Sequence, residues 1–451
     1  MVSLMQAQVE FRSWLSWISQ LNPEGSAPMK RIGLVCLGLA LGAANTVHAQ
    51  GLTMQMSNGW SFTFSGNVNS FIYYTATNTG GTTPLPDPTG PAYQPSTAVG
   101  GLVPPLGTVR ATRITVGLLP AFAVFDAKGK EGNTDLGVHF GFAPSVQCAQ
   151  GTNDCFQNHL DMRQVYLTFG GTWGQVLVGR ELGLYSRQNI LTDQTLFGIG
   201  GSGADGVPGG FNNPGGTTTL GRIGLGYVYP QFRAQITYST VAGRPYQLSI
   251  GVFEGASVGG YAFTQIPRVE SEFTYSASGF KGWLGGTLES TKDAARNGTS
   301  LTSWGGSGGL RYEKAMFSVT GSGYYGRGIG TTFYGLGGSS DLFLTSSGSD
   351  DARKSYGFIG QITVTPANSK VTVAGSYGSS YLKASDNDKT VANDFRTENT
   401  LISGGIYYQA TKSLKVVGEF DYEWTKLKVA GSTVGKKNTR YTPGIGFMLF
   451  F

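Results

Sequence analysis

Few side chains in this 451-residue chain could act as general bases or metal ligands. The chain has three histidines, and His139 and His159 are the two that lie beyond its first fifty residues. A Ser-His-acid hydrolase would have to use one of these imidazoles as its base. The sequence has no paired-histidine metal spacing and no phosphate-binding loop. We therefore expect no enzyme activity, no metal and no cofactor.

Carboxylates recur at every second position in two places, which are Glu270 with Glu272, and Glu419 with Asp421 and Glu423. Successive side chains of a β-strand point to opposite faces, so this spacing places each group on one face of a strand. Such a group could bind a cation or a positively charged solute. The simpler interpretation is a solvated charge paired with Arg268, Arg311 or Lys415.

Cys148 and Cys155 lie in a polar segment, and in an oxidising compartment they would close a small loop through a disulfide. Two free thiols are the alternative. A zinc site is less favoured because only His159 is nearby and a second cysteine pair is missing.

The composition excludes several classes of protein. Charged residues make up 13% of the chain, 70 residues are glycine and 12% are aromatic, whereas a soluble helical or α/β protein carries roughly 25% charge and about 7% glycine. The long apolar run from Ile32 to Ala44 has about 13 residues where a spanning helix needs about 20. The net charge of +6 is carried by scattered lysines and arginines, so we expect no nucleic-acid partner. A β-rich protein remains.

The first fifty residues have the pattern of an export signal. Met29, Lys30 and Arg31 form a basic segment, an apolar segment follows, and small residues end at Ala49. We therefore predict a signal peptide over residues 29–49, an upstream extension from a misassigned start over residues 1–28, and a mature chain over residues 50–451.

Alternation of apolar and polar residues is the clearest pattern of the mature chain. Near the end, Tyr441, Ile445 and Phe447 share one face, while Arg440 and Thr442 share the other. Many segments run past ten residues, which is longer than strands of soluble sandwiches and suits strands tilted across a hydrocarbon layer. In lipid every backbone group must be paired, so such a sheet must close. The pattern predicts a transmembrane antiparallel β-barrel.

Sixteen segments are expected to be strands: 60–75, 109–125, 134–144, 161–170, 174–183, 219–239, 245–254, 268–277, 280–290, 303–313, 316–327, 353–365, 370–381, 398–410, 413–428 and 438–451. The segment 219–239 changes phase near Pro230. As a hairpin it would give seventeen strands, so we prefer one long strand with a bulge. Short and long connections alternate between these strands, and the long ones include 184–218.

This ordered set resembles the trimeric general-diffusion porins of Gram-negative outer membranes, in particular the β-proteobacterial type. The local matches are Met162 to Leu167 followed by Gly174 to Arg180, and the alternating C-terminal strand that ends at Phe451. The resemblance implies a homotrimer in the cell outer membrane, in contact with membrane lipid and lipopolysaccharide. It also implies that the barrel-assembly machinery recognises Phe451.

The resemblance further implies that the third loop, 184–218, folds into the lumen and narrows it, with basic wall residues facing acidic loop residues. Arg113, Arg180 and Arg222 match the basic positions. Alternation independently places Arg113 and Arg222 toward water, together with His139. Arg180 shares the phase of Val176 and Val178, so its place in the lumen rests on the resemblance.

The loop side of the expected constriction has fewer acidic residues than in the family. The loop reads Thr195-Leu196-Phe197-Gly198, with Asp193 upstream and Asp205 downstream, and the matching carboxylate is missing. A less acidic loop predicts a mild anion preference. The alternative is that Asp193 and Asp205 restore a balanced transverse field.

The sequence therefore predicts a water-filled channel for passive diffusion of small hydrophilic solutes. The main alternative is a substrate-selective channel for a sugar or organic acid, with lumen aromatics as a guiding track, namely Tyr73, Tyr166, Tyr324 and Tyr407. A barrel plugged by its loops, acting as an adhesin or a structural protein, is a third possibility.

Overall fold

The computed structural model describes residues 51–79, 85–87, 90–93, 110–147, 160–201, 218–255, 263–293, 299–332, 342–343, 351–391, 394–430 and 437–451. The expected extension and signal peptide over residues 1–49, together with Cys148, Cys155 and Asp205, lie outside this described part. No helix among the described residues is long and apolar enough to cross a membrane.

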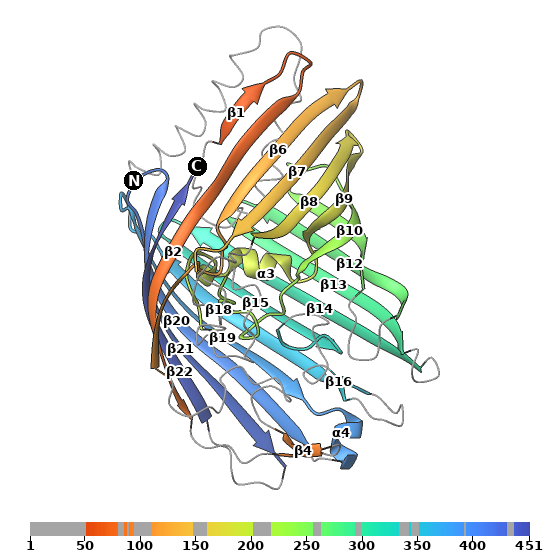
Figure 1. Cartoon of the computed structure of the whole chain (residues 1–451), viewed down its shortest axis with the longest axis vertical. Helices are drawn as coiled ribbons and strands as arrows, with labels where there is room; N and C mark the ends of the chain where they lie inside the picture. Colours follow the sequence, from red (N-terminus) through yellow and green to blue (C-terminus); the bar gives the residue numbers. More distant parts are fainter. Residues whose placement is uncertain are drawn as a thin grey trace.

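The chain forms one closed antiparallel barrel (Figure 1). The first long strand, β2 (Ser61–Thr79), pairs with the last, β22 (Lys437–Phe450), in a register that runs from Asn67 opposite Phe450 to Thr79 opposite Asn438. This pairing removes the free edges of the sheet, as lipid requires. Both β5 (Arg110–Thr115) and β6 (Phe122–Glu131) pair with β2, so they share one position of the barrel. The wall thus has the sixteen predicted positions, and the predicted all-β barrel is confirmed.

The remaining wall strands follow in chain order: β7 (Thr134–Pro144), β8 (Leu160–Gly171), β9 (Gly174–Leu182), β10 (Phe232–Ser239), β11 (Tyr246–Phe253), β12 (Phe263–Ala277), β13 (Phe280–Asp293), β14 (Thr299–Lys314), β15 (Phe317–Arg327), β18 (Lys354–Val364), β19 (Val371–Lys383), β20 (Phe395–Gln409) and β21 (Leu414–Val429). Short strands lie outside these positions: β1 (Leu52–Gln55) beside β2, β3 (Leu85–Asp87) with β4 (Gly90–Tyr93), and β16 (Leu342–Phe343) with β17 (Asp351–Ala352).

The two faces of the wall differ in chemistry. Along β22, the odd-numbered Tyr441, Ile445, Phe447 and Leu449 are exposed on the outside, whereas the even-numbered residues between them are mostly buried. The same alternation exposes large apolar side chains around the outer surface, including Val68, Ile72, Leu310, Ile362, Ile406 and Phe420. A continuous apolar outer face of this kind is the surface that a bilayer covers.

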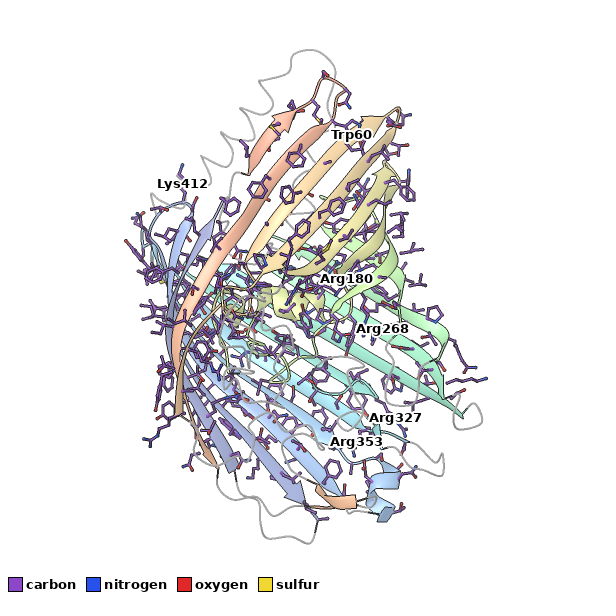
Figure 2. The ribbon with its side chains drawn as sticks, in the orientation of Figure 1. Trp60, Arg180, Arg268, Arg327, Arg353 and Lys412 are labelled. Atoms are coloured by element: carbon purple, nitrogen blue, oxygen red, sulfur yellow. The ribbon has the colours of Figure 1, made fainter. Side chains whose placement is uncertain are left out.

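The two ends of the barrel have connections of different length. Short turns join β8 to β9, β12 to β13 and β14 to β15 at one end. Figure 2 shows Trp60 and Lys412 at this end, uppermost in the view, with Arg353 toward the other end. The helix α4 (Asp386–Val391) and the β3–β4 pair lie at the lower, long-loop end (Figure 1).

Two predicted strands differ from the structure. The segment predicted at 219–239 becomes a strand only at Phe232, because Gly221, Gly224 and Gly226 have positive φ angles that interrupt extended backbone. The strand predicted at 109–125 is broken at residues 116–121.

Candidate functional site

The chain leaves the wall after β9 and rejoins it at β10, and the described residues between these strands, 183–201 and 218–231, are called the inward segment. The Gly183 amide donates to the Gln231 carbonyl at 2.8 Å and closes the base of this excursion. Its described parts, 183–201 and 218–231, include α3 (Arg187–Thr192) and the 3-10 turn η1 (Gln194–Phe197). Figure 1 shows α3 and the coil beside it within the curved wall, near mid-height. The predicted inward loop 184–218 is thus part of a longer excursion.

Wall carboxylates hold the inward segment by its backbone. Glu270 Oε2 accepts from the amides of Leu184 and Tyr185 at 2.7 and 2.9 Å. On the opposite side, Glu419 Oε1 accepts from the amides of Ile199 and Gly200 at 2.7 and 2.6 Å. Hydrogen bonds to a charged acceptor are roughly twice as strong as neutral ones. These two glutamates face the lumen as predicted, and they act there as tethers.

A third wall carboxylate, Glu272, holds a side chain of the same segment. Its two oxygens accept from Arg187 Nη2 at 2.5 Å and from Nε at 3.2 Å. Next to this pair, the Trp283 indole donates to Asn189 Oδ1 at 2.7 Å and fixes α3 against β13. Of the three predicted partners, Arg268 pairs with Glu270, at 3.5 Å between Nη1 and Oε1. The predicted pairings with Arg311 and Lys415 are not among the ion pairs that these acids make within the described ranges. Arg311 instead donates to Glu313 at 2.7 Å.

Asp193 forms hydrogen bonds and an ion pair with other residues of the inward segment. Its oxygens accept from the Thr195 amide and hydroxyl at 3.1 and 2.6 Å, and from the Tyr227 hydroxyl at 3.1 Å. Arg222 Nε lies 3.4 Å from the same carboxylate, and both side chains are fully buried. Burial and the negative charge of Asp193 raise the pKa of Tyr227 well above its ordinary value. The carboxylate is therefore engaged within the segment.

Arg222 does not stand on the wall, contrary to the prediction that it opens the sixth strand. It lies on the returning part of the inward segment and donates to the Ser376 hydroxyl and to the Leu401 carbonyl at 3.2 Å. Alternation of Ile223, Leu225 and Tyr227 indicated a strand, but these side chains are buried inside the barrel.

The break in the wall at residues 116–121 receives the inward segment. The amides of Leu118 and Leu119 donate to the carbonyls of Gly198 and Leu196 at 2.9 and 3.2 Å. On the wall side, Asn69 donates to the Leu119 carbonyl and accepts from the Gly117 amide, both at 2.9 Å. A Cβ on Gly117 would lie 2.4 Å from the Gly198 carbonyl oxygen, so this close approach requires glycine. Backbone hydrogen bonds thus join the inward segment to the wall at this break.

Apolar packing completes the attachment. Phe197 and Ile199 lie in one buried cluster with Phe71, Tyr73 and Tyr407. Lys415 places its ammonium 3.9 Å above the Phe197 ring. The Tyr407 hydroxyl also donates to the Gln194 carbonyl at 3.0 Å.

The other three tyrosines of the hypothesised sugar track are also buried, between 3% and 8% exposed. Tyr324 belongs to a cluster with Tyr185 of the inward segment, and Tyr166 stacks on His139 at 4.5 Å between ring centroids. These rings pack within the protein and do not present an exposed aromatic path.

Arg180 is on the outside of the barrel, and its expected place in the lumen is wrong. It stands directly opposite Val165 on β8 and Ala234 on β10, and its side chain is exposed. Glu181 has the inward phase instead and accepts from Gln164 at 2.8 Å. The phase of Val176 and Val178, which placed Arg180 toward lipid, was the correct signal. Arg113, opposite the buried Tyr73, faces inward as predicted.

The remaining predicted residues keep to the wall. His139 faces inward, and its Nδ1 lies 2.9 Å from Asp126 Oδ1. Its Nε2 has no hydrogen-bond partner within the described ranges, so no hydroxyl or thiol there is placed to exchange a proton with it. Glu423 accepts from Arg440 at 2.6 Å, and Asp421 is buried beside Glu419. The part of the chain that the structure describes has no cluster of acidic, histidine or cysteine side chains suited to a metal ion.

Some residues that hold the site carried no signal in the sequence. Gln361 on β18 accepts from the Gln194 amide at 2.7 Å and donates to the Thr192 carbonyl at 3.0 Å. The side chains of Asn67 and Asn69 donate to the carbonyls of Pro120 and Leu119, where the broken strand has no backbone hydrogen bonds to β2. The sequence shows that these are polar residues on the inward face of their strands, but many other wall residues have the same property.

A small cavity lies between α3 and the short turn after β10. It has a volume of about 180 Å³ and is bordered by Gln188, Gln247, Thr274 and Lys281, among others. Lys281 has no ion-pair partner within the described ranges. Oε1 of Gln188, a residue only 3% exposed, has no hydrogen-bond partner there either.

Comparisons with solved structures decide the fold type. The outer membrane channel DcaP of Acinetobacter baumannii matches with a TM-score of 0.60 and 15% identity, covering 88% of this chain and 99% of that chain. The anion-selective porin from Comamonas acidovorans matches with a TM-score of 0.55 and 14% identity, over 87% of this chain and 100% of that one. The chain has the porin fold.

A third porin structure supports the same conclusion. Salmonella typhi OmpF, in complex with daunomycin, matches with a TM-score of 0.52 and 14% identity, over 88% of this chain and 100% of that chain. No family model and no curated protein sequence matches the chain. At these identities the likeness concerns the porin fold, and the residues of the inward segment have to be interpreted from their own contacts.

Proposed function

We propose that the protein is an outer-membrane porin of a Gram-negative bacterium, through which small hydrophilic solutes and ions diffuse passively. One observation carries the proposal: a closed barrel, apolar outside and polar inside, with an inward segment tethered by Glu270 and Glu419. A segment held this firmly across the lumen would set the width of the path. The protein acts as a channel and not as an enzyme.

The proposal includes the assembly expected from the sequence. The homotrimer, the contacts with lipid and lipopolysaccharide, and the recognition of Phe451 by the barrel-assembly machinery follow from the resemblance. Phe451 is suitably placed for this role, because its amide and carbonyl pair with Gly66 at 3.0 and 2.9 Å and close the last strand on β2. Mass spectrometry of the exported protein would show whether it begins at Gln50 and whether Cys148 and Cys155 are bonded.

Selectivity is proposed to favour anions mildly. Asp193, the acidic residue expected on the loop side, has no exposed side-chain surface. Glu270, Glu272 and Glu419 are occupied by groups of the inward segment. Lys281 faces the lumen and has no ion-pair partner within the described ranges. Positive charge is therefore less compensated along the path.

Liposome swelling tests the channel itself. Vesicles that contain the refolded protein should swell in sugars of increasing size at rates that fall steadily with size. Equal rates with and without protein would exclude a diffusion channel. Reversal potentials in a salt gradient test the selectivity, and a clear cation preference would contradict the proposed charge balance.

The cavity beside α3 favours a second candidate, a channel that binds a small organic anion. The cavity volume of about 180 Å³ is close to the roughly 150 Å³ of an engineered protein cavity that holds benzene. A three-carbon hydroxy acid is a molecule of about the size of benzene and would fit this cavity. Lys281, together with Arg244, which also borders the cavity, would bind the carboxylate, and Gln188 the hydroxyl. Lactate should then block single-channel current at millimolar concentration, and Lys281→Gln should relieve the block; propionate and glycerol, which each lack one group, should block less.

A further inference from the structure

An aspartate and a histidine form a hydrogen-bonded pair on the lumen face of β6 and β7, which lie side by side in the wall (Figure 1). His139 stands directly opposite Asp126, and its Nδ1 lies 2.9 Å from Asp126 Oδ1. Both residues are more than nine-tenths buried. A carboxylate beside one ring nitrogen favours the tautomer that is protonated there, which leaves Nε2 as an acceptor. This Nε2 has no hydrogen-bond partner among the described residues.

A second acceptor faces the same point of the wall. Gln164 on β8 stands opposite Gly141 on β7, and its Nε2 donates to Glu181 Oε2 at 2.8 Å. A Cβ on Gly141 would lie 2.8 Å from Gln164 Oε1 and 3.3 Å from His139 Nε2. Two acceptors cannot hydrogen-bond to each other, so the space that they share suits a group that donates to both. We call this space, beside Gly141 and between the two atoms, the acceptor notch.

A β-bulge in β8 produces this geometry. The pairing of β7 with β8 changes register after Gly141, which leaves Arg163 as an extra residue next to Gln164. A bulge of this kind re-aims the side chains beside it. Arg163 donates to Asp161 at 2.7 Å, and its guanidinium lies 5.8 Å from the centroid of the Phe232 ring. The cation that is nearest to Gln164 in the chain therefore has partners of its own.

Two carboxylates stand behind the acceptor notch, one at each acceptor. Asp126 holds the imidazole of His139, and Glu181 holds the amide of Gln164. Neither carboxylate forms an ion pair with a lysine or an arginine in the part of the chain that the structure describes. A carboxylate at Nδ1 makes the opposite ring nitrogen more basic, and hydrogen bonds in a chain polarise one another. Both acceptors are therefore strengthened, and a positive charge in the notch is favoured.

We propose that the acceptor notch binds the primary ammonium group of a small solute in the lumen. The inference rests on the proposed function for the access of such solutes to this wall. An ammonium group has three donors and no acceptor, so it can donate to His139 Nε2 and Gln164 Oε1 while its third N–H faces water. Hydrogen bonds from a charged donor are stronger than neutral ones, so a cation without N–H groups binds less well. The notch is separate from the cavity beside α3, where Lys281 and Arg244 would bind an anion.

The test compares two cations of equal charge and two variants that each add one methyl group. Methylammonium has N–H donors, and tetramethylammonium has none. Gly141→Ala fills the acceptor notch, whereas the control Gly137→Ala adds its methyl on the same face of β7, beside the Thr168 hydroxyl. The full-length proteins, with nitrogen-15-labelled histidine, are refolded in a neutral detergent at mildly alkaline pH, where imidazole is neutral. The Nε2 resonance of His139, assigned with His139→Gln, is followed by NMR as each cation is added.

Methylammonium should shift this resonance saturably in wild type and in Gly137→Ala, and tetramethylammonium should not. Gly141→Ala should need at least about tenfold more methylammonium for the same shift, which is the loss expected for one hydrogen bond to a charged group. Gln164→Met removes the amide acceptor without filling the notch and should weaken binding similarly, so the test stands if Gly141→Ala does not refold.

An unchanged resonance in wild type would show that the notch holds water only and would overturn the proposal. Equal shifts by the two cations, or wild-type affinity in both Gly141→Ala and Gln164→Met, would also overturn it. Binding in detergent requires no open channel, so a failed titration and a failure of the proposed channel function are distinguishable by the conductance of the same samples.

Discussion

Removal of the Glu419 tether tests how the inward segment is held. In Glu419→Ala the amides of Ile199 and Gly200 lose their shared acceptor, at 2.7 and 2.6 Å in the native protein. A buried donor left without a partner costs about 1–3 kcal/mol. Two such donors should lower the free energy of local opening by at least about 2 kcal/mol, which is roughly a 30-fold change in the opening equilibrium.

Amide hydrogen exchange of the refolded protein measures this change directly. The amides of Ile199 and Gly200 should exchange about 30-fold faster in Glu419→Ala, and Glu419→Gln should lie between because its carbonyl remains an acceptor. Glu270→Ala is the matched control: it should accelerate the amides of Leu184 and Tyr185 and leave the other two unchanged. Unchanged exchange at residues 199 and 200 in Glu419→Ala would refute the assignment of Glu419 as a tether.

Three further predictions concern charges at different depths. Asp193→Asn leaves a buried guanidinium without its counter-ion, at a cost of roughly 3–5 kcal/mol, and should make the inward segment cleavable by protease while wild type resists. Arg113→Gln should shift the reversal potential toward cations, whereas Arg180→Gln, which changes an outward residue, should leave it unchanged; equal shifts would contradict the two placements. The ammonium of Lys389 donates to Asp386 and holds the pKa of the Asp386 carboxyl below its ordinary 3.8. The stabilisation of α4 by this pair is therefore complete above pH 3.8 and is lost as the pH falls through the lowered pKa. Carbon NMR should show the Asp386 carboxyl titrating at higher pH in Lys389→Gln.

The barrel wall could be predicted from the sequence because the environment of each wall residue depends only on the face of the strand that it occupies. A residue in a wall strand faces either lipid or the lumen, so the identity of each side chain reports its own phase. This is why β7 was predicted at its observed bounds. It is also why alternation placed Arg180 outside, where the resemblance to a family misplaced it.

The inward segment could not be predicted in the same way. Ile223, Leu225 and Tyr227 alternate as a strand does, yet they are buried against the inner wall. Apolar residues that face lipid and apolar residues that face a packed interior give the same pattern. The glycines at 221, 224 and 226 with positive φ angles were the sequence clue against a strand.

The roles of the wall carboxylates were also beyond the sequence. Glu270 and Glu419 were correctly placed in the lumen. Their tethering role depends on backbone amides 85 to 220 residues away in the chain. No spacing rule reports a contact of that range, because it exists only after the barrel closes.

Single-channel recording tests the central claim most directly. The refolded mature protein, residues 50–451, is added to a planar bilayer with potassium chloride on both sides. We expect discrete open steps that occur in groups of three, persist without added solutes and carry more anion than cation current in a gradient. A membrane that stays silent after verified insertion would contradict the account and would indicate a barrel closed by its inward segment.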